Sequence, residues 1–505
     1  MGNRNRHQGM ECFADGAQYV GGVSRSGTSG RTQEIVDPAS GEVVHRYALA
    51  STADVDAAVA AAREAFPGWA RATPGERSDA LHRFATLLGE RADGLARVES
   101  LQCGKPLKLT TEFDVPGTVD NTSFFAGAAR RLTGQSAGEY SGDHTSYVRR
   151  EPIGVIGSIA PWNYPLQMAA WKILPAIAAG NTIVLKPAEI TPLTSLMFAR
   201  AATEAGIPAG VINVVSGTGA EAGEHLVGHP DVAMVSFTGS TAVGRRVAEI
   251  ATASVKRTHL ELGGKAPFLV FDDADTEAAV QGAVAAALIN SGQDCTAATR
   301  VYVQRSRYRE VVEGIAETMA TVRVGDPFDP STDIGPLVTH AHRDRVAGFV
   351  ERARSYATVV TGGRVPEGPG AYYPPTLITG APQGSEVVGA EIFGPVLVAL
   401  PFDSDDEGIA LANDTPYGLA ASAWTRDVFR AQRATREIAA GCVWINDHIP
   451  IISEMPHGGM KASGYGKDMS AYSFEEYTQV KHVMFDNTAA VRKDWHRTVF
   501  GDRQG

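Results

Sequence analysis

One cysteine lies in a segment that could present a reactive thiol. Cys295 ends the sequence Gly292-Gln293-Asp294-Cys295, a glycine-containing turn after an apolar helical stretch through Ala279, Val284 and Leu288. A thiolate at such a turn is a nucleophile that can attack a carbonyl carbon. Buried cysteines more often serve as inert packing residues, so the thiol alone leaves both interpretations open.

A glutamate that precedes a pair of glycines could likewise be either catalytic or structural. Glu261 is followed by Leu262-Gly263-Gly264-Lys265. A glutamate at the end of a strand can act as a general base on water. The alternative is a surface ion pair with Lys265.

Three strand-to-helix junctions could hold a dinucleotide. Lys186-Pro187-Ala188-Glu189 follows a predicted strand, where Glu189 could accept hydrogen bonds from ribose hydroxyls and repel a 2′-phosphate. Phe237-Thr238-Gly239-Ser240 precedes a helix whose first backbone amides suit a pyrophosphate. Residues 217–223 come nearest to the glycine-rich dinucleotide fingerprint but have one residue too many. A salt bridge or a plain glycine turn would also explain each junction.

Strands and helices alternate through the segments that must position these residues. The first series has predicted strands at residues 155–159, 182–185, 211–215 and 235–237, and helices at 166–179, 193–205 and 241–251. A second series begins at 268–271, with a helix from Asp275 or Thr276 to about 292 and strands at 301–303, 359–360 and 396–400. This alternation predicts parallel sheets that bind ligands at the carboxyl ends of their strands. We expect the boundary between the two units near residues 262–265.

Helices are also predicted upstream of the first series. A helix capped by Ser51 or Thr52 places Val55 and Val59 on one apolar face, and Pro67 is expected to end it. More helix follows over residues 75–102.

Composition narrows the class of protein. The chain has 505 residues, which predicts two or three domains, and a formal net charge of -11, which disfavours nucleic acid and anionic membranes as partners. No apolar run approaches the roughly 18 residues that span a bilayer. Four cysteines without a CxxC pair predict neither a metal site nor a disulfide scaffold, and favour a reducing, cytoplasmic location.

Taken together, the motifs resemble those of the aldehyde dehydrogenase superfamily. The resemblance extends from about Val36 to Met484. Its six motifs occur in the family's order and register: Pro161-Trp162-Asn163-Tyr164-Pro165, Lys186-Pro187-Ala188-Glu189, Phe237-Thr238-Gly239-Ser240, Glu261-Leu262-Gly263-Gly264-Lys265, Gly292-Gln293-Asp294-Cys295 and Glu391-Ile392-Phe393-Gly394-Pro395.

The resemblance assigns expected roles to these residues. Cys295 matches the nucleophile, Glu261 the general base, and Asn163 the amide donor of the oxyanion hole. The expected cofactor is NAD, and Gly217 and Gly219 are not expected to bind it. The matching cofactor positions are Trp162, Lys186, Glu189, Phe237, Gly239, Ser240, Leu262, Glu391 and Phe393.

The family's architecture implies an α/β fold with a Rossmann-type NAD-binding domain, an α/β catalytic domain and a β-arm for oligomerisation. We expect a flexible leader at residues 1–30, the NAD-binding domain at 31–140 and 154–262, the arm at 141–153 and 473–490, the catalytic domain at 263–472, and a tail at 491–505. The expected assembly is a homo-oligomer, either a dimer or a tetramer built as a dimer of dimers.

Within the superfamily the chain is most similar to γ-aminobutyraldehyde dehydrogenases and their betaine-aldehyde relatives. The supporting segments are residues 123–130, 144–146, 293–298 and 453–459. An ω-aminoaldehyde carries an ammonium, which a carboxylate or an aromatic face should meet. Asp114 aligns with an acidic residue used for this purpose in related enzymes, whereas Gly117 replaces a second one. Further candidates are Phe113, Trp171, Trp444 and Asp447.

Other substrates and functions stay open at this point. Betaine aldehyde, 3-aminopropanal or a broad range of aldehydes are alternative substrates. Transfer of the acyl group to coenzyme A is a second enzyme class, which the presence of Glu261 disfavours. A catalytically inactive structural homologue is a third possibility, which intact Cys295, Asn163 and Glu391 disfavour.

Overall fold

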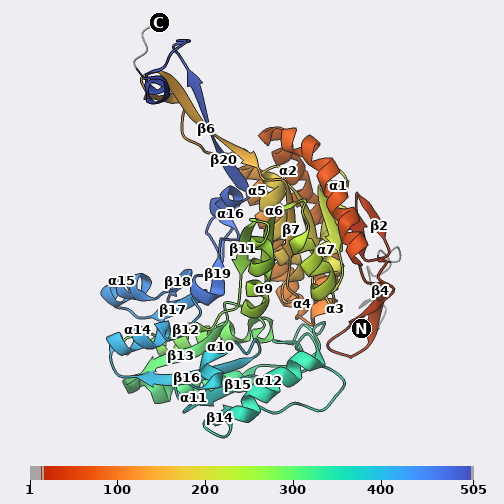
Figure 1. Ribbon diagram of the computed structural model, residues 1–505. Helices are drawn as coiled ribbons and strands as arrows, with labels where there is room; N and C mark the ends of the chain where they lie inside the picture. Colours follow the sequence, from red (N-terminus) through yellow and green to blue (C-terminus); the bar gives the residue numbers. More distant parts are fainter. Residues whose placement is uncertain (1–12, 14–15, 502–505) are drawn as a thin grey trace.

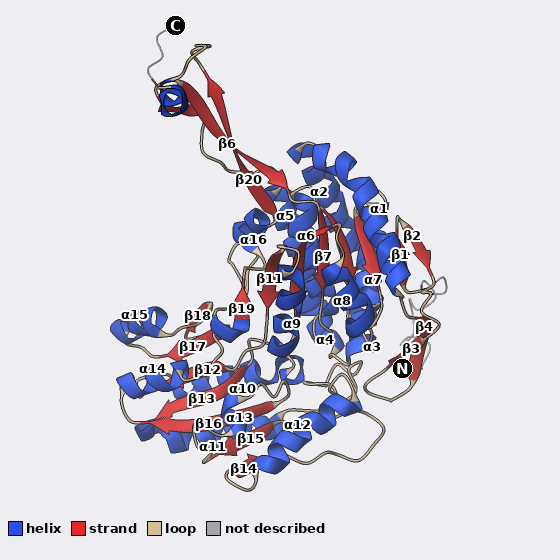
Figure 2. Ribbon diagram, viewed as in Figure 1, coloured by secondary structure: helices blue, strands red, loops and turns tan. Residues whose placement is uncertain are grey.

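Two α/β bodies and a projecting arm make up the chain (Figure 1). The computed structural model describes residue 13 and residues 16–501. The two bodies are built on sheets of eight and seven strands, and the arm on three (Figure 2). None of the helices in these described residues is both long and apolar enough to cross a membrane.

The eight-stranded sheet has the order β19-β11-β10-β7-β8-β9-β1-β2. The run from β11 to β9 is parallel, and β19, β1 and β2 are antiparallel to their neighbours. The strand bounds are β1 (Gln18–Val20), β2 (Val23–Arg25), β7 (Val155–Ile159), β8 (Thr182–Lys186), β9 (Ile212–Val215), β10 (Val232–Thr238), β11 (Arg257–Glu261) and β19 (Gly464–Tyr465).

Alternate residues of these strands face two different cores, because successive side chains of a strand point to opposite faces of the sheet. Ile183 and Leu185 of β8 join one apolar cluster, whereas Val184 between them joins another. The covering helices are α1 (Thr52–Arg71), α2 (Pro74–Glu90), α3 (Ala92–Cys103), α5 (Val115–Ala128), α6 (Pro165–Ala178), α7 (Leu193–Glu204), α8 (Glu224–Gly228), α9 (Thr241–Thr252) and α16 (Ser470–Glu476). Short turns of helix lie at Leu107–Leu109, Thr110–Asp114 and Gly219–Gly223.

The seven-stranded sheet has the order β14-β15-β16-β13-β12-β17-β18, and only β14 is antiparallel to its neighbour. Its strands are β12 (Ala266–Val270), β13 (Ala298–Gln304), β14 (Thr358–Thr361), β15 (Thr376–Thr379), β16 (Val396–Phe402), β17 (Ala420–Trp424) and β18 (Cys442–Ile445). Its helices are α10 (Thr276–Leu288), α11 (Arg305–Thr321), α12 (His340–Ala353), α13 (Glu386–Gly389), α14 (Asp405–Asn413) and α15 (Val428–Glu437), with short turns at Ile289–Gly292 and Lys461–Ser463. Both sheets confirm the predicted α/β class with parallel, Rossmann-like packing.

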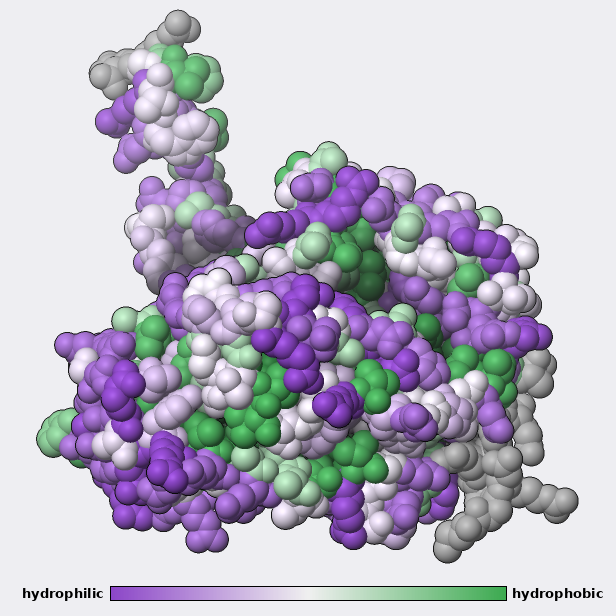
Figure 3. All heavy atoms as spheres, turned by 90° about the horizontal axis from the view of Figure 1, so that it is seen from below, coloured by the Kyte–Doolittle hydropathy of each residue, from purple (hydrophilic) through white to green (hydrophobic). Residues whose placement is uncertain are grey.

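The arm projects away from both bodies (Figure 3). Its strands are β5 (Gly138–Ser141), β6 (His144–Pro152) and β20 (Thr478–Asp486), with β20 antiparallel to β6 from Thr478 opposite Pro152 to Asp486 opposite His144. A short helix, α17 (Arg497–Phe500), and the turn Asp494–His496 lie at its outer end (Figure 1). A separate hairpin joins β3 (Thr32–Val36) to β4 (Val43–Ala48).

Two expectations about segment boundaries were wrong. Residues 16–30 are not all leader, because β1 extends the eight-stranded sheet beside β9; residues 1–12, 14 and 15 lie outside the described part. Residues 464–472 do not stay in the second body, because β19 pairs with β11 and α16 packs on α5 and α6. The predicted helical stretch at residues 75–102 is confirmed and consists of two helices that meet at Arg91.

Pro67 does not end the first helix, which begins after the predicted cap at Ser51 and continues to Arg71. A proline inside a helix removes one backbone donor, so the last turn needs another source of stability. Trp69 provides it: the side chain is buried, and its indole Nε1 donates to the Ile177 carbonyl of α6 at 2.9 Å.

Replacing Trp69 by Phe should therefore destabilise the fold. The substitution removes one of two donors to the Ile177 carbonyl, which also accepts from the Gly180 N–H at 3.0 Å, and losing such a hydrogen bond costs about 0.5–1.5 kcal/mol. Chemical denaturation should show the loss in the free energy of unfolding, whereas exposed Trp495→Phe should change it little. Equal stability of the two variants would contradict this account of the last turn.

Candidate active site

A cavity of about 310 Å³ lies between the two bodies. The first body supplies the carboxyl ends of β10 and β11, and the second supplies the loops that lead into β13 and β16. The sequence-predicted residues that line the cavity are Phe113, Trp162, Asn163, Trp171, Gly239, Ser240, Glu261, Leu262, Cys295, Glu391 and Phe393.

The Cys295 loop leaves α10 through an uncommon backbone conformation. Asn290, Ser291 and Gly292 all have positive φ, at 48°, 56° and 71°. Left-handed conformation costs a non-glycine residue roughly 1–2 kcal/mol, so contacts must hold the loop. Ser291 Oγ donates to the Gly335 carbonyl at 2.8 Å, and a Cβ on Gly292 would lie 2.3 Å from the Gly394 oxygen. This turn brings Cys295 to the cavity wall.

Asn163 holds its side-chain amide against the same loop. Its Nδ2 donates to the Gln293 carbonyl at 3.1 Å, and its own carbonyl accepts from Asn290 Nδ2 at 2.9 Å. An amide nitrogen carries two hydrogens, so one N–H of Asn163 is left for an oxygen in the cavity. Burial, followed by the negative charges of Asp294 and Glu261, raises the pKa of the Cys295 thiol well above its ordinary value. The thiol therefore needs a base to ionise.

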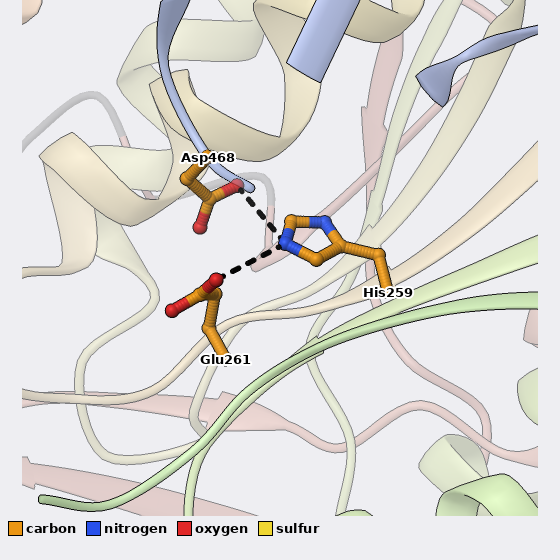
Figure 4. Close-up of side chains that lie close together, drawn as sticks. All are labelled: His259, Glu261 and Asp468. Atoms are coloured by element: carbon orange, nitrogen blue, oxygen red, sulfur yellow. Dashed lines mark ion pairs between the residues drawn. The ribbon is translucent and has the colours of Figure 1, made fainter. Parts of the chain in front are cut away.

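Glu261 ends β11 and is buried beside two other titratable side chains (Figure 4). Its Oε1 lies 3.5 Å from His259 Nε2, and Asp468 Oδ1 lies 3.9 Å from the same nitrogen. Burial and the nearby Asp468 raise the pKa of Glu261 well above its ordinary value. A carboxylate with a raised pKa is a stronger base, which is the property that activation of water requires.

The opposite side of the cavity carries groups that fit a dinucleotide. Glu391 accepts the Gly264 N–H at 2.9 Å, and a Cβ on Gly263 would lie 2.3 Å from Glu391 Oε2. Phe393 has a positive φ of 61° and packs edge-on against Trp162 at 5.4 Å. The Thr238 hydroxyl lines the cavity at the start of α9 and has no hydrogen-bond partner among the described residues.

Two cavity residues from α12 were missed by sequence analysis. Arg345 donates to the Ile392 carbonyl at 2.7 Å and the Glu391 carbonyl at 2.9 Å. His342 Nε2 lies 2.7 Å from the Phe393 oxygen. Both residues fix the loop that carries Glu391, and no local motif marks α12.

Three predicted cofactor residues lie outside the cavity lining. Lys186 ends β8, is buried, and donates to the Pro187 carbonyl at 2.8 Å, with Glu189 Oε2 at 3.4 Å. Phe237 packs beneath the next turn, because a Cβ on Gly239 would lie 2.6 Å from its ring. All three remain at the carboxyl edge of the same sheet.

Asp114 does not reach the cavity. Its side chain is fully buried, and Oδ2 accepts from Lys105 Nζ at 2.6 Å. Lys105 lies 3.6 Å over the Tyr164 ring, so that ring separates the ion pair from the cavity it lines. Burial raises the pKa of Asp114, and Lys105 opposes this rise. Asp114 is therefore a poor candidate for binding a substrate cation.

Trp444 and Asp447 also lie outside the cavity lining. Trp444 Nε1 donates to the Pro450 carbonyl at 2.9 Å, which braces the loop that carries the lining residue Ile449. Asp447 is exposed and accepts the His448 N–H at 2.8 Å. The carboxylate that does line this end is Asp294, whose Oδ2 accepts from the Tyr164 hydroxyl at 2.8 Å. Its position next to Cys295 was the available signal in the sequence.

Replacing Asp114 by Ala should change stability rather than substrate choice. The substitution leaves Lys105 buried with only Glu99 at 3.9 Å, and breaking a buried ion pair costs about 3–5 kcal/mol. Thermal denaturation should show a clear fall in Tm, with exposed Asp447→Ala as the control. A stable variant that loses only its preference for cationic aldehydes would restore Asp114 as a binding residue.

Comparison with known proteins agrees with this geometry. Residues 25–483 match the model of the aldehyde dehydrogenase family. The chain is 40% identical to DhaS of Bacillus subtilis (strain 168) over 479 residues, which are 94% of this chain and 97% of that protein. Two similar solved structures are NAD+ complexes. One is an aldehyde dehydrogenase of Bacillus cereus (39% identity, TM-score 0.93, 95% of this chain and 98% of that one). The other is betaine aldehyde dehydrogenase of Staphylococcus aureus (34% identity, TM-score 0.93, 96% and 98%). NAD is the cofactor expected from the sequence, and this chain belongs to the aldehyde dehydrogenase family.

Proposed function

We propose that the chain oxidises an aldehyde to a carboxylic acid with NAD, through a thioester on Cys295. The observation that carries this proposal is the convergence of Cys295, Asn163 and Glu261 on one cavity. A nucleophile, an amide donor and a buried base are the groups that oxidation through a thioester requires.

Each of these residues has a step in the proposed reaction. The Cys295 thiol gives its proton to solvent water, and its Sγ bonds to the aldehyde carbon. The carbonyl oxygen becomes an oxyanion, which the free N–H of Asn163 and the Cys295 backbone N–H stabilise. NAD, when bound, accepts the hydride that converts this adduct into a thioester. Glu261 then takes a proton from water, which attacks the thioester and releases the acid and the thiol.

The cofactor would be held along the carboxyl edge of the eight-stranded sheet. Glu391 and Phe393 would hold the nicotinamide ribose, and Thr238 and Ser240 would meet the pyrophosphate at the start of α9. Ser240 is exposed and caps that helix, whose N-terminus favours negative charge. Glu189 would accept from the adenosine ribose and repel a 2′-phosphate, which favours NAD over NADP.

The proposed substrates are ω-aminoaldehydes, with 4-aminobutanal in equilibrium with 1-pyrroline as the first candidate. Asp294 supports this choice because its carboxylate lines the cavity beside Cys295. Trp171 adds an aromatic face and packs 5.0 Å from His457. The name of the Staphylococcus aureus relative makes betaine aldehyde the main competitor, since aromatic faces also bind quaternary ammonium groups.

The arm supports a proposed homo-oligomer. Val480, Met484 and Phe485 of β20 are exposed on this projecting sheet. Exposed apolar side chains and an unpaired edge strand are features that a second copy can cover.

Glu261→Gln should leave the first turnover intact and slow the later ones. The amide cannot accept the proton of water, so the thioester should accumulate. With NAD+ and butanal, stopped-flow absorbance should show a burst of NADH below or near one equivalent per chain, followed by a steady rate reduced by about 100-fold or more. An unchanged steady rate would contradict the role of Glu261. Dependence of the wild type on coenzyme A would show acyl transfer to that thiol instead.

Asp294→Asn should reduce the preference for cationic aldehydes. Loss of one ion pair worth about 1.4 kcal/mol lowers kcat/KM tenfold. We expect this loss with 4-aminobutanal and a smaller one with butanal or succinic semialdehyde, measured by NADH formation. Asp447→Asn is the matched control. An equal loss with butanal would show that Asp294 acts by positioning Cys295, and a wild type that prefers butanal would overturn the substrate proposal.

A further inference from the structure

Three ligand atoms converge in the buried cluster around Glu261 (Figure 4). They are His259 Nε2, Glu261 Oε1 and Asp468 Oδ1, all within 4.8 Å of one another. All three side chains are buried, and none of these atoms has a hydrogen-bond partner among the described residues. A buried polar atom without a partner is costly, so three of them aimed at one point need an explanation.

The separations suit a small divalent ion. Zinc binds nitrogen and oxygen at about 2.0–2.2 Å, which places tetrahedral ligand atoms roughly 3.4 Å apart. His259 Nε2 lies 3.5 Å from Glu261 Oε1 and 3.9 Å from Asp468 Oδ1, and all three atoms lie within 4.8 Å of one another, so side-chain shifts that shorten these separations would complete three ligand positions. Glu261 and Asp468 line the cavity, through which the ion and a fourth ligand, water, would enter.

The two lysines near the cluster are each bonded to other groups, so neither occupies the position of the cation. Lys172 Nζ bonds Asp468 Oδ2 at 2.8 Å, so Oδ1 stays available. Lys467 Nζ donates to the carbonyls of Gly458 and Gly459, and Glu476 accepts from the Lys467 backbone N–H at 3.3 Å. Three carboxyl groups, those of Glu261, Asp468 and Glu476, thus surround the cluster, against two lysine side chains.

The contacts of His259 also suit ligation. Its Nδ1 lies 3.2 Å from the Ser236 hydroxyl, whose oxygen can accept the Nδ1–H, orient the ring and leave the Nε2 lone pair for a metal. An imidazole with two carboxylates favours zinc or another transition metal over calcium or magnesium, which prefer more oxygen ligands.

We propose that His259, Glu261 and Asp468 form an inhibitory site for Zn²⁺, in which the ion binds the lone pair that Glu261 needs as a base. The inhibition rests on the proposed function of Glu261, whereas the binding does not. A bound ion stops activation of water but leaves Cys295 free to form the thioester.

Metal binding is tested without aldehyde or cofactor. Co²⁺, which has visible absorption bands when four- or five-coordinate, is titrated into Cys295→Ser protein, because this background removes the thiol that would itself bind the metal. We expect one Co²⁺ per chain, displaced by Zn²⁺. Adding His259→Asn should abolish the spectrum, whereas adding exposed His482→Asn should not.

A second variant keeps the test decisive if His259→Asn does not fold, as judged by circular dichroism. Glu261→Gln in the Cys295→Ser background should weaken Co²⁺ binding at least tenfold in equilibrium dialysis. Absence of bound metal in Cys295→Ser protein, or binding unchanged by the substitution at position 259 or 261, would overturn the proposal.

Inhibition is tested with the wild-type protein, NAD+ and butanal. Zn²⁺ should lower steady NADH formation while the burst of the first turnover persists, and a chelator should restore the rate. Loss of the burst together with the steady rate would place zinc on Cys295 and overturn the inhibitory role of the cluster. A protein that binds Co²⁺ at the cluster but oxidises no aldehyde would refute the proposed function and leave the metal site standing.

Discussion

The site depends on the short segment that connects the two sheets. Residues 262–265 carry the chain from the end of β11 to the start of β12. Both glycines in this segment touch the site: a Cβ on Gly263 would lie 2.3 Å from Glu391, and a Cβ on Gly264 would lie 2.3 Å from the Cys295 carbonyl. Only a bare backbone lets the base, the nucleophile loop and the Glu391 loop meet at this point. The segment that follows Glu261 therefore brings it close to both loops of the second body.

Burial decides which charged groups can do chemistry. Two buried pairs flank the cavity, Lys172 with Asp468 at 2.8 Å and Lys105 with Asp114 at 2.6 Å. The first pair reaches the cavity, because Asp468 lines it beside Glu261. The second lies outside the lining, and Asp114 acts within the protein interior. Two similar buried ion pairs therefore have different roles, because only one of them has a carboxylate that lines the cavity.

Sequence motifs marked residues that line the cavity, because these residues sit at strand ends and in short loops. Cys295, Glu261 and Asn163 come from three such places, and the resemblance of their motifs to a known family, rather than strand-helix alternation alone, singled them out. The failures came from long-range packing. Nothing local shows that Lys105 neutralises Asp114, that β1 pairs with β9, or that the chain returns at Gly464 to pair with β11. The role of α12 was likewise hidden, since His342 and Arg345 act on a loop about fifty residues away.

The most direct test of the account is to find the acyl group on the protein. Wild-type protein is mixed with NAD+ and butanal, quenched in acid within the first turnovers, and digested for peptide mass spectrometry. The thioester mechanism predicts a butanoyl group on the peptide that contains Cys295, which disappears as butanoate forms, and none on the peptides that contain Cys103 or Cys442. Formation of butanoate and NADH without acylation of Cys295 at any time would contradict the thioester mechanism.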